Sequence, residues 1–307
     1  MVRNWLVSAW VVAALLLFSV SSAAAASPAP ILYIQGLQCP AHESCSGRAA
    51  YNDRIREIPK VGYPSKALSN GTFSDSEPAW SPDHLQIAFV RESRNGLSFT
   101  IWVMNADGSN PKQLTHGNVL DTEPAWSPDG KTILFRGPSA GGHSFDLYTV
   151  GADGAGQKRV TSNAADVTAT HPDWSPGGKL IVFQRMKTGS GAGTGIYTIE
   201  PNGTGLKRLT IGGLEPAWSP NGKQIAFVSS DSSAPNVNEI FVMSAAGTGK
   251  RRLTSGAEST SPAWSPTGAQ IAFLRDSQIT LINTDGTGIK QLTKPLHGLA
   301  FVDTPDW

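Results

Sequence analysis

The sequence carries little charge and almost no excess of either sign. Charged residues make up 16% of its 307 positions, and 25 Lys and Arg residues against 24 Asp and Glu residues leave a formal net charge of +1. Proteins that bind nucleic acid or anionic membranes usually show a marked basic excess. We therefore expect neither nucleic acid nor a membrane surface to be the main partner.

Motifs typical of catalysis or metal binding are also missing. The sequence has no Gly-x-Ser-x-Gly elbow of an α/β-hydrolase, and its six histidines show no metal-binding spacing. The glycine-rich stretch 189–195 joins two expected strands, without a helix N-terminus that could hold a phosphate. We therefore predict no catalytic residue, no metal ion and no cofactor.

Cysteine is scarce, since only Cys39 and Cys45 are present. In an exported protein this pair would form a disulfide that closes one short loop. The alternative is a metal site with His42 and Glu43, but this lacks a second pair of ligands at zinc spacing. We predict the disulfide.

Long hydrophobic runs are absent except at the N-terminus. Arg3 is the only charge before an apolar run from Trp5 to Val20, and small residues follow up to Ala26. A basic start, an apolar run and an Ala-x-Ala site are typical of a cleaved signal peptide, here 1–26, whereas a membrane span needs about 20 apolar residues. We expect a periplasmic or secreted monomer with no membrane span after cleavage; an uncleaved anchor is the alternative.

Glycine and proline are abundant, at 32 and 21 residues, and a Pro-x-Trp motif recurs six times. The spacing between successive tryptophans is 43 to 48 residues. In five copies the motif continues as Trp-Ser-Pro, which predicts a tight corner because proline presets the first turn angle. The six tryptophans are Trp80, Trp126, Trp174, Trp218, Trp264 and Trp307.

Each repeat contains four short segments rich in β-branched and aromatic residues, bounded by turn residues. Four antiparallel strands in about 45 residues are typical of a propeller blade. Residues 31–34, 55–58 and 66–69 resemble a second, third and fourth strand without a first, which 304–307 can supply. We therefore predict an all-β, six-bladed β-propeller over 27–307, with its ring closed by the C-terminal strand joining the N-terminal blade.

The repeats resemble those of TolB-like, WD40-like propellers, most closely at 123–131 (Glu-Pro-Ala-Trp-Ser-Pro-Asp-Gly-Lys) and at 103–115. The resemblance covers 31–307. It implies a periplasmic protein that binds partners through its propeller and is not an enzyme. Because the repeats begin soon after the expected signal peptide, we expect no counterpart of the N-terminal α/β domain that TolB carries. Similar propellers also form sugar-lyase folds.

Polar residues recur at two positions that a propeller brings to one end of its channel. Three residues before the tryptophan lie Glu77, Glu123, His171 and Glu215. Ten or eleven residues after it lie Arg91, Arg136, Arg185 and Arg275. Because the first strand begins where the antiparallel second strand ends, we expect both sets on one rim.

The rim has two interpretations. Ion pairs within a blade are expected between Glu77 and Arg91 and between Glu123 and Arg136, and such pairs can be purely structural. Alternatively, the rim binds a ligand. Glu215 and Arg275 have no such partner in their own blades, so substitution of these two residues would test ligand binding. We predict a non-catalytic scaffold that binds a protein or peptide at the cell envelope. The alternative is a carbohydrate-active enzyme, lyase- or hydrolase-like, using the channel mouth, with His171 beside two carboxylates.

Overall fold

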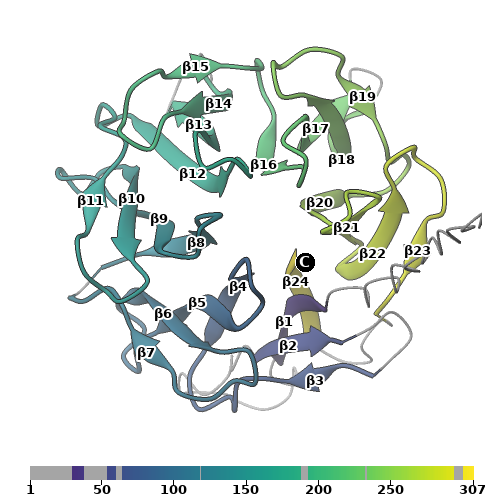
Figure 1. Ribbon diagram of the computed structural model, residues 1–307. Helices are drawn as coiled ribbons and strands as arrows, with labels where there is room; N and C mark the ends of the chain where they lie inside the picture. Colours follow the sequence, from purple (N-terminus) through teal and green to yellow (C-terminus); the bar gives the residue numbers. More distant parts are fainter. Residues whose placement is uncertain are drawn as a thin grey trace, which may run out of the picture.

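The computed structural model describes residues 30–37, 54–59, 64–117, 119–187, 193–231, 234–293 and 300–307. These residues form six four-stranded antiparallel sheets arranged around a central axis (Figure 1). The predicted signal peptide 1–26 and the Cys39–Cys45 disulfide lie outside the described residues. No helix in the described part of the chain has the length and apolar character needed to cross a membrane.

The sheets are the blades, which we number 1 to 6 along the chain from the one that contains Trp80. Blades 1 and 2 consist of β4 (Asp75–Trp80), β5 (Gln86–Glu92), β6 (Phe99–Asn105) and β7 (Lys112–Gln113), then β8 (Thr122–Trp126), β9 (Thr132–Pro138), β10 (Phe145–Gly151) and β11 (Lys158–Arg159). Blades 3 and 4 consist of β12 (Val167–Trp174), β13 (Ile181–Lys187), β14 (Gly195–Ile199) and β15 (Lys207–Arg208), then β16 (Leu214–Trp218), β17 (Gln224–Asp231), β18 (Ala234–Ser244) and β19 (Arg251–Arg252).

Blade 5 consists of β20 (Ser259–Trp264), β21 (Gln270–Arg275), β22 (Gln278–Asn283) and β23 (Lys290–Gln291). Blade 6 joins the two ends of the chain in the order β24 (Ala300–Asp306), β1 (Ile31–Leu37), β2 (Arg54–Ile58) and β3 (Lys66–Ala67). The register pairs Leu32 with Asp306 and Ile34 with Asp303. The predicted six-bladed ring and its closure by the C-terminal strand are therefore confirmed.

The hydrophobic core lies between neighbouring blades. Trp126 and Phe135 of blade 2, for example, pack against Val90 and Ile101 of blade 1. Each second strand from blade 1 to blade 5 places a phenylalanine in such a layer, and these five side chains are at most 1% exposed: Phe89, Phe135, Phe183, Phe227 and Phe273. Repetition of one aromatic pair in each layer explains the tryptophan spacing, because every blade must bury the same face.

Candidate functional site

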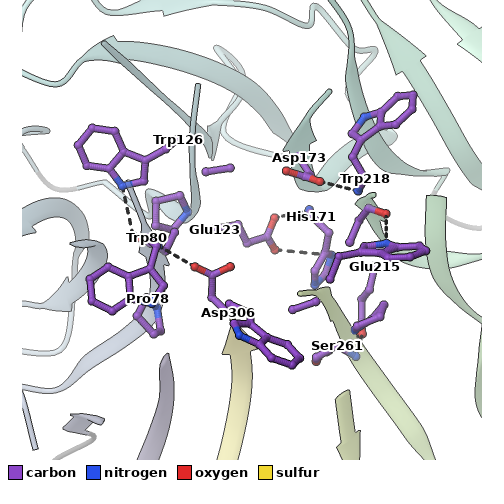
Figure 2. Close-up of a pocket in the computed structure, with 18 of the residues that line it drawn as sticks. Pro78, Trp80, Glu123, Trp126, His171, Asp173, Glu215, Trp218, Ser261 and Asp306 are labelled. Atoms are coloured by element: carbon purple, nitrogen blue, oxygen red, sulfur yellow. Dashed lines mark hydrogen bonds and ion pairs between the residues drawn. The ribbon is translucent and has the colours of Figure 1, made fainter. Parts of the chain in front are cut away.

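A pocket of about 480 Å³ lies on the axis of the ring, where the inner strands of all six blades meet. Figure 2 shows the carboxylates of Glu123 and Asp306 pointing into this space. The described lining contains two histidines, His84 and His171, and neither lysine nor arginine. Tryptophans and the Pro-x-Trp prolines supply half of the lining residues that are not carboxylates. Five carboxylates also line it: Glu77, Glu123, Asp173, Glu215 and Asp306.

The inner strands carry a β-bulge at the residue three before the tryptophan. In β4, for example, the register with β5 shifts between Ser76 and Ala79. The residue at this position has a left-handed backbone, which costs a non-glycine residue about 1 kcal/mol. The backbone φ angle lies between 49° and 57° at all five such residues: Glu77, Glu123, His171, Glu215 and Ser261.

The glutamates at the bulges connect each blade to the next. Glu77 accepts a hydrogen bond at 2.5 Å from the backbone N–H of Glu123, and Glu123 accepts one at 2.5 Å from that of His171. Glu215 accepts one at 2.7 Å from the backbone N–H of Ser261. We call these contacts the inter-blade clamps. A hydrogen bond to a charged group typically contributes about 1.5–3 kcal/mol.

Two aspartates form the same kind of clamp one residue before the tryptophan. Asp306 accepts the backbone N–H of Trp80 at 2.7 Å, and Asp173 accepts that of Trp218 at 2.6 Å. Burial, together with the charge of Asp306, raises the pKa of Asp173 to about 7. Burial also raises the pKa of Asp306. Sequence reasoning missed both residues, although the other four repeats have alanine at this position.

All four predicted arginines lie outside the pocket lining. Arg136 contacts Glu123 at 3.3 Å, as predicted. For Arg91 the predicted partner was Glu77, but its guanidinium binds Asp75 through two bonds of 2.6 and 2.9 Å. The bulge contributes to this correction, because its extra residue places Asp75, instead of Ser76, opposite Arg91.

The remaining two arginines contact loop residues. Arg185 donates to the side chain of Asn163 at 3.4 Å, and Arg275 donates to the backbone carbonyl of Ser255 at 2.8 Å. The structure thus brings Glu77, Glu123, His171 and Glu215 together in one pocket but does not add the arginines to its lining. That the acids and His171 bind a ligand stays a prediction.

His171 is largely exposed and lies beside one carboxylate. Its Nδ1 is 3.9 Å from Oε1 of Glu123. Among the described residues, no three His, Cys, Asp or Glu side chains are placed to hold a metal ion. The arrangement expected for a lyase, with two carboxylates beside His171, therefore differs from the contact that the structure describes.

His84 is a further pocket residue that the sequence reasoning left out. It occupies the corner between β4 and β5 with a backbone φ of 55°. Its imidazole lies against the indole of Trp80, with 5.3 Å between ring centroids. Its Nδ1 is buried and has no hydrogen-bond partner among the described residues. The signal was visible in the sequence, because the other four corners have glycine here.

These features define the class of the protein as a six-bladed β-propeller with a polar pocket on its axis. The chain is a TolB-like propeller, since residues 63–215 match the family model described as the TolB beta propeller domain. No curated protein matches the sequence.

Solved structures with the same fold include TolB from Acinetobacter baumannii, at a TM-score of 0.70 and 24% identity, covering 91% of this chain. Hydrazine synthase from Kuenenia stuttgartiensis has a TM-score of 0.70 and a sequence identity of 16%, and the match covers 91% of this chain. The match to oligogalacturonate lyase from Vibrio parahaemolyticus covers 89% of this chain and 76% of the lyase. Its TM-score is 0.56 and its sequence identity is 11%. The chain spans 66% of that TolB chain and 46% of the hydrazine synthase chain. At these identities the likeness concerns the fold alone.

Proposed function

We propose that the protein is an exported, non-catalytic scaffold whose axial pocket receives a segment of a protein or peptide partner at the cell envelope. The observation that carries this proposal is the pocket itself. Its volume of about 480 Å³ falls within the range of natural ligand sites. Its wall of tryptophan and proline, interrupted by a few fixed carboxylates, suits amino-acid side chains.

The inter-blade clamps support binding over catalysis. Each of the five lining carboxylates accepts a backbone N–H of the next blade, at 2.5 to 2.7 Å. Such bonds hold the blades in place and fix the shape of the pocket. A rigid, preorganised wall favours binding, because less side-chain entropy is lost when a partner enters.

Export rests on the expected signal peptide 1–26 and on the resemblance to a periplasmic family. The alternative, a carbohydrate-active enzyme, would use His171 with two carboxylates at the channel mouth. His171 lies near one carboxylate, that of Glu123. We therefore favour the binding function.

The test is affinity capture with the tagged mature chain from an envelope extract of the source organism. The pocket variant is Ala125→Phe, which places a ring in the lining, and the control is Lys158→Ala on the exposed outer strand β11. We expect the wild type and Lys158→Ala to retain the same protein and Ala125→Phe to lose it while still melting cooperatively. Equal retention by Ala125→Phe, no retained protein, or turnover of an oligogalacturonide by the wild type would contradict the proposal.

A further inference from the structure

The corner between the first and second strands is built in the same way in blades 1 to 5, with one exception. Its fourth residue has a left-handed backbone in every copy, with φ between 55° and 69°. Glycine adopts this conformation without penalty, whereas another residue is strained. Four corners have glycine, at Gly130, Gly178, Gly222 and Gly268, and blade 1 has His84.

Within the part of the chain that the structure describes, the one aromatic contact that the fold gains from this histidine is the one with Trp80. A non-glycine residue in the left-handed region costs on the order of 1 kcal/mol, and strain of this kind is typical of functional sites. The ring of His84 lies against Trp80 at the pocket wall, and its buried Nδ1 has no hydrogen-bond partner among the described residues. In its neutral form such a nitrogen can accept a hydrogen bond from a ligand.

One further departure from the repeat lies at the same joint, between blade 6 and blade 1. Asp306 replaces the alanine found in four other copies, and its carboxylate holds the backbone N–H of Trp80 at 2.7 Å. Trp307, the final residue, is half-buried and lines the pocket as well. A protonated His84 lies close enough to Asp306 to lower the pKa of that carboxyl, against the larger rise that burial causes. His84 and Asp306 therefore lie in one sector of the pocket, whereas Asp173 makes the same kind of contact from blade 3.

We propose that His84, Asp306 and Trp307 form the specificity-determining sector of the pocket and that this sector takes a basic side chain of the protein partner. The inference rests on the proposed function and adds the chemistry of the contact. A guanidinium can donate to the carboxylate of Asp306 and to Nδ1 of His84. The indole of Trp307, half-buried in the same wall, is suited to cation–π contact.

The rest of the pocket has the charge that such a ligand requires. Its lining holds five carboxylates and neither lysine nor arginine. A cation entering this space is attracted by the ionised carboxylates, and an acidic side chain is repelled. With a pKa of about 7, Asp173 is only partly ionised at neutral pH. The lining thus favours a basic segment over an acidic one, while His84 fixes where in the ring the basic group binds.

The test measures the binding of three blocked tripeptides to the mature chain by titration calorimetry: Ac-Ala-Arg-Ala-NH₂, the same peptide with glutamine, and the same with glutamate. We expect the arginine peptide to bind at least about tenfold more tightly than the other two, the equivalent of about 1.4 kcal/mol. Equal binding of the three, or tighter binding of the glutamate peptide, would overturn the proposal.

The decisive variant is His84→Gly, which restores the residue of the other corners. It should melt close to the wild-type temperature, because relief of the strain offsets the lost contact with Trp80, yet bind the arginine peptide at least about tenfold more weakly. Gly130→His is the matched control, since it introduces the same residue at another corner and should not substitute for His84 when combined with His84→Gly. Unchanged affinity in His84→Gly refutes the role of this sector. The protein could capture an envelope protein through the pocket and yet fail to bind the arginine peptide. That result would refute the inference but not the proposed function.

Discussion

Asp121 is a buried carboxylate whose arginine is missing, and its replacement by asparagine should stabilise the protein. In blade 1 the equivalent residue, Asp75, binds Arg91 through two bonds. In blade 2 the position of Arg91 is taken by Gly137, and a Cβ placed on that glycine would lie 2.7 Å from Oδ1 of Asp121. Asp121 is only 4% exposed, and burial raises its pKa to about 6.

The sign and size of the effect follow from this pKa. A carboxyl group with a pKa of about 6 in the folded state and 3.8 otherwise binds protons more tightly when folded. The contribution of Asp121 to the free energy of unfolding is therefore greatest below about pH 4 and is lost as the pH rises through 6. A shift of this size corresponds to about 3 kcal/mol at most, and nearby solvent reduces the expected gain of Asp121→Asn to about 1–2 kcal/mol at pH 7.

The assay is urea unfolding of the wild type and Asp121→Asn at several pH values between 4 and 8. The difference in the free energy of unfolding should be close to zero at pH 4, grow up to about pH 6 and then stay constant. The matched variant, Asp75→Asn, should instead lose about 3 kcal/mol at pH 7, because it leaves the buried guanidinium of Arg91 without a negative charge, and this outweighs the burial that raises the pKa of Asp75. A destabilised Asp121→Asn at pH 7, or a difference that does not change with pH, would refute the reasoning.

Two further predictions concern the ring and its turns. Deletion of 301–307 removes most of β24, and we expect the melting temperature, followed by circular dichroism, to fall by more than about 10 °C; an unaltered melt would contradict closure through this strand. Gly108→Ala should cost at least about 2 kcal/mol, because φ is 87° and the added Cβ would collide with the backbone oxygen of Leu68. Gly142→Ala, with φ of 70° and open space around it, is the control and should cost about 1 kcal/mol; equal losses in chemical denaturation would argue against the collision.

The sequence alone determined the architecture, because every blade of a propeller buries the same pattern of residues against its neighbours. The interval between tryptophans such as Trp80 and Trp126 reflects four strands and their turns, so the number of blades can be counted. The incomplete repeat at 31–69 and the final motif at 304–307 complement one another, and this predicted the shared blade. The histidine at the first corner was also visible, since His84 stands where the other corners have glycine.

Only the tertiary structure decided which side chains meet at the axis. The clamps join residues about 46 positions apart, such as Glu77 and the backbone of Glu123, and no local pattern specifies that contact. The bulge placed Asp75 opposite Arg91, where the expected partner was Glu77, because one extra residue changes the register of a strand. Asp306 reaches Trp80 across 226 positions, since ring closure brings the last strand beside the first complete blade. Spacing along the chain therefore determines the ring, and contacts between blades determine its pocket.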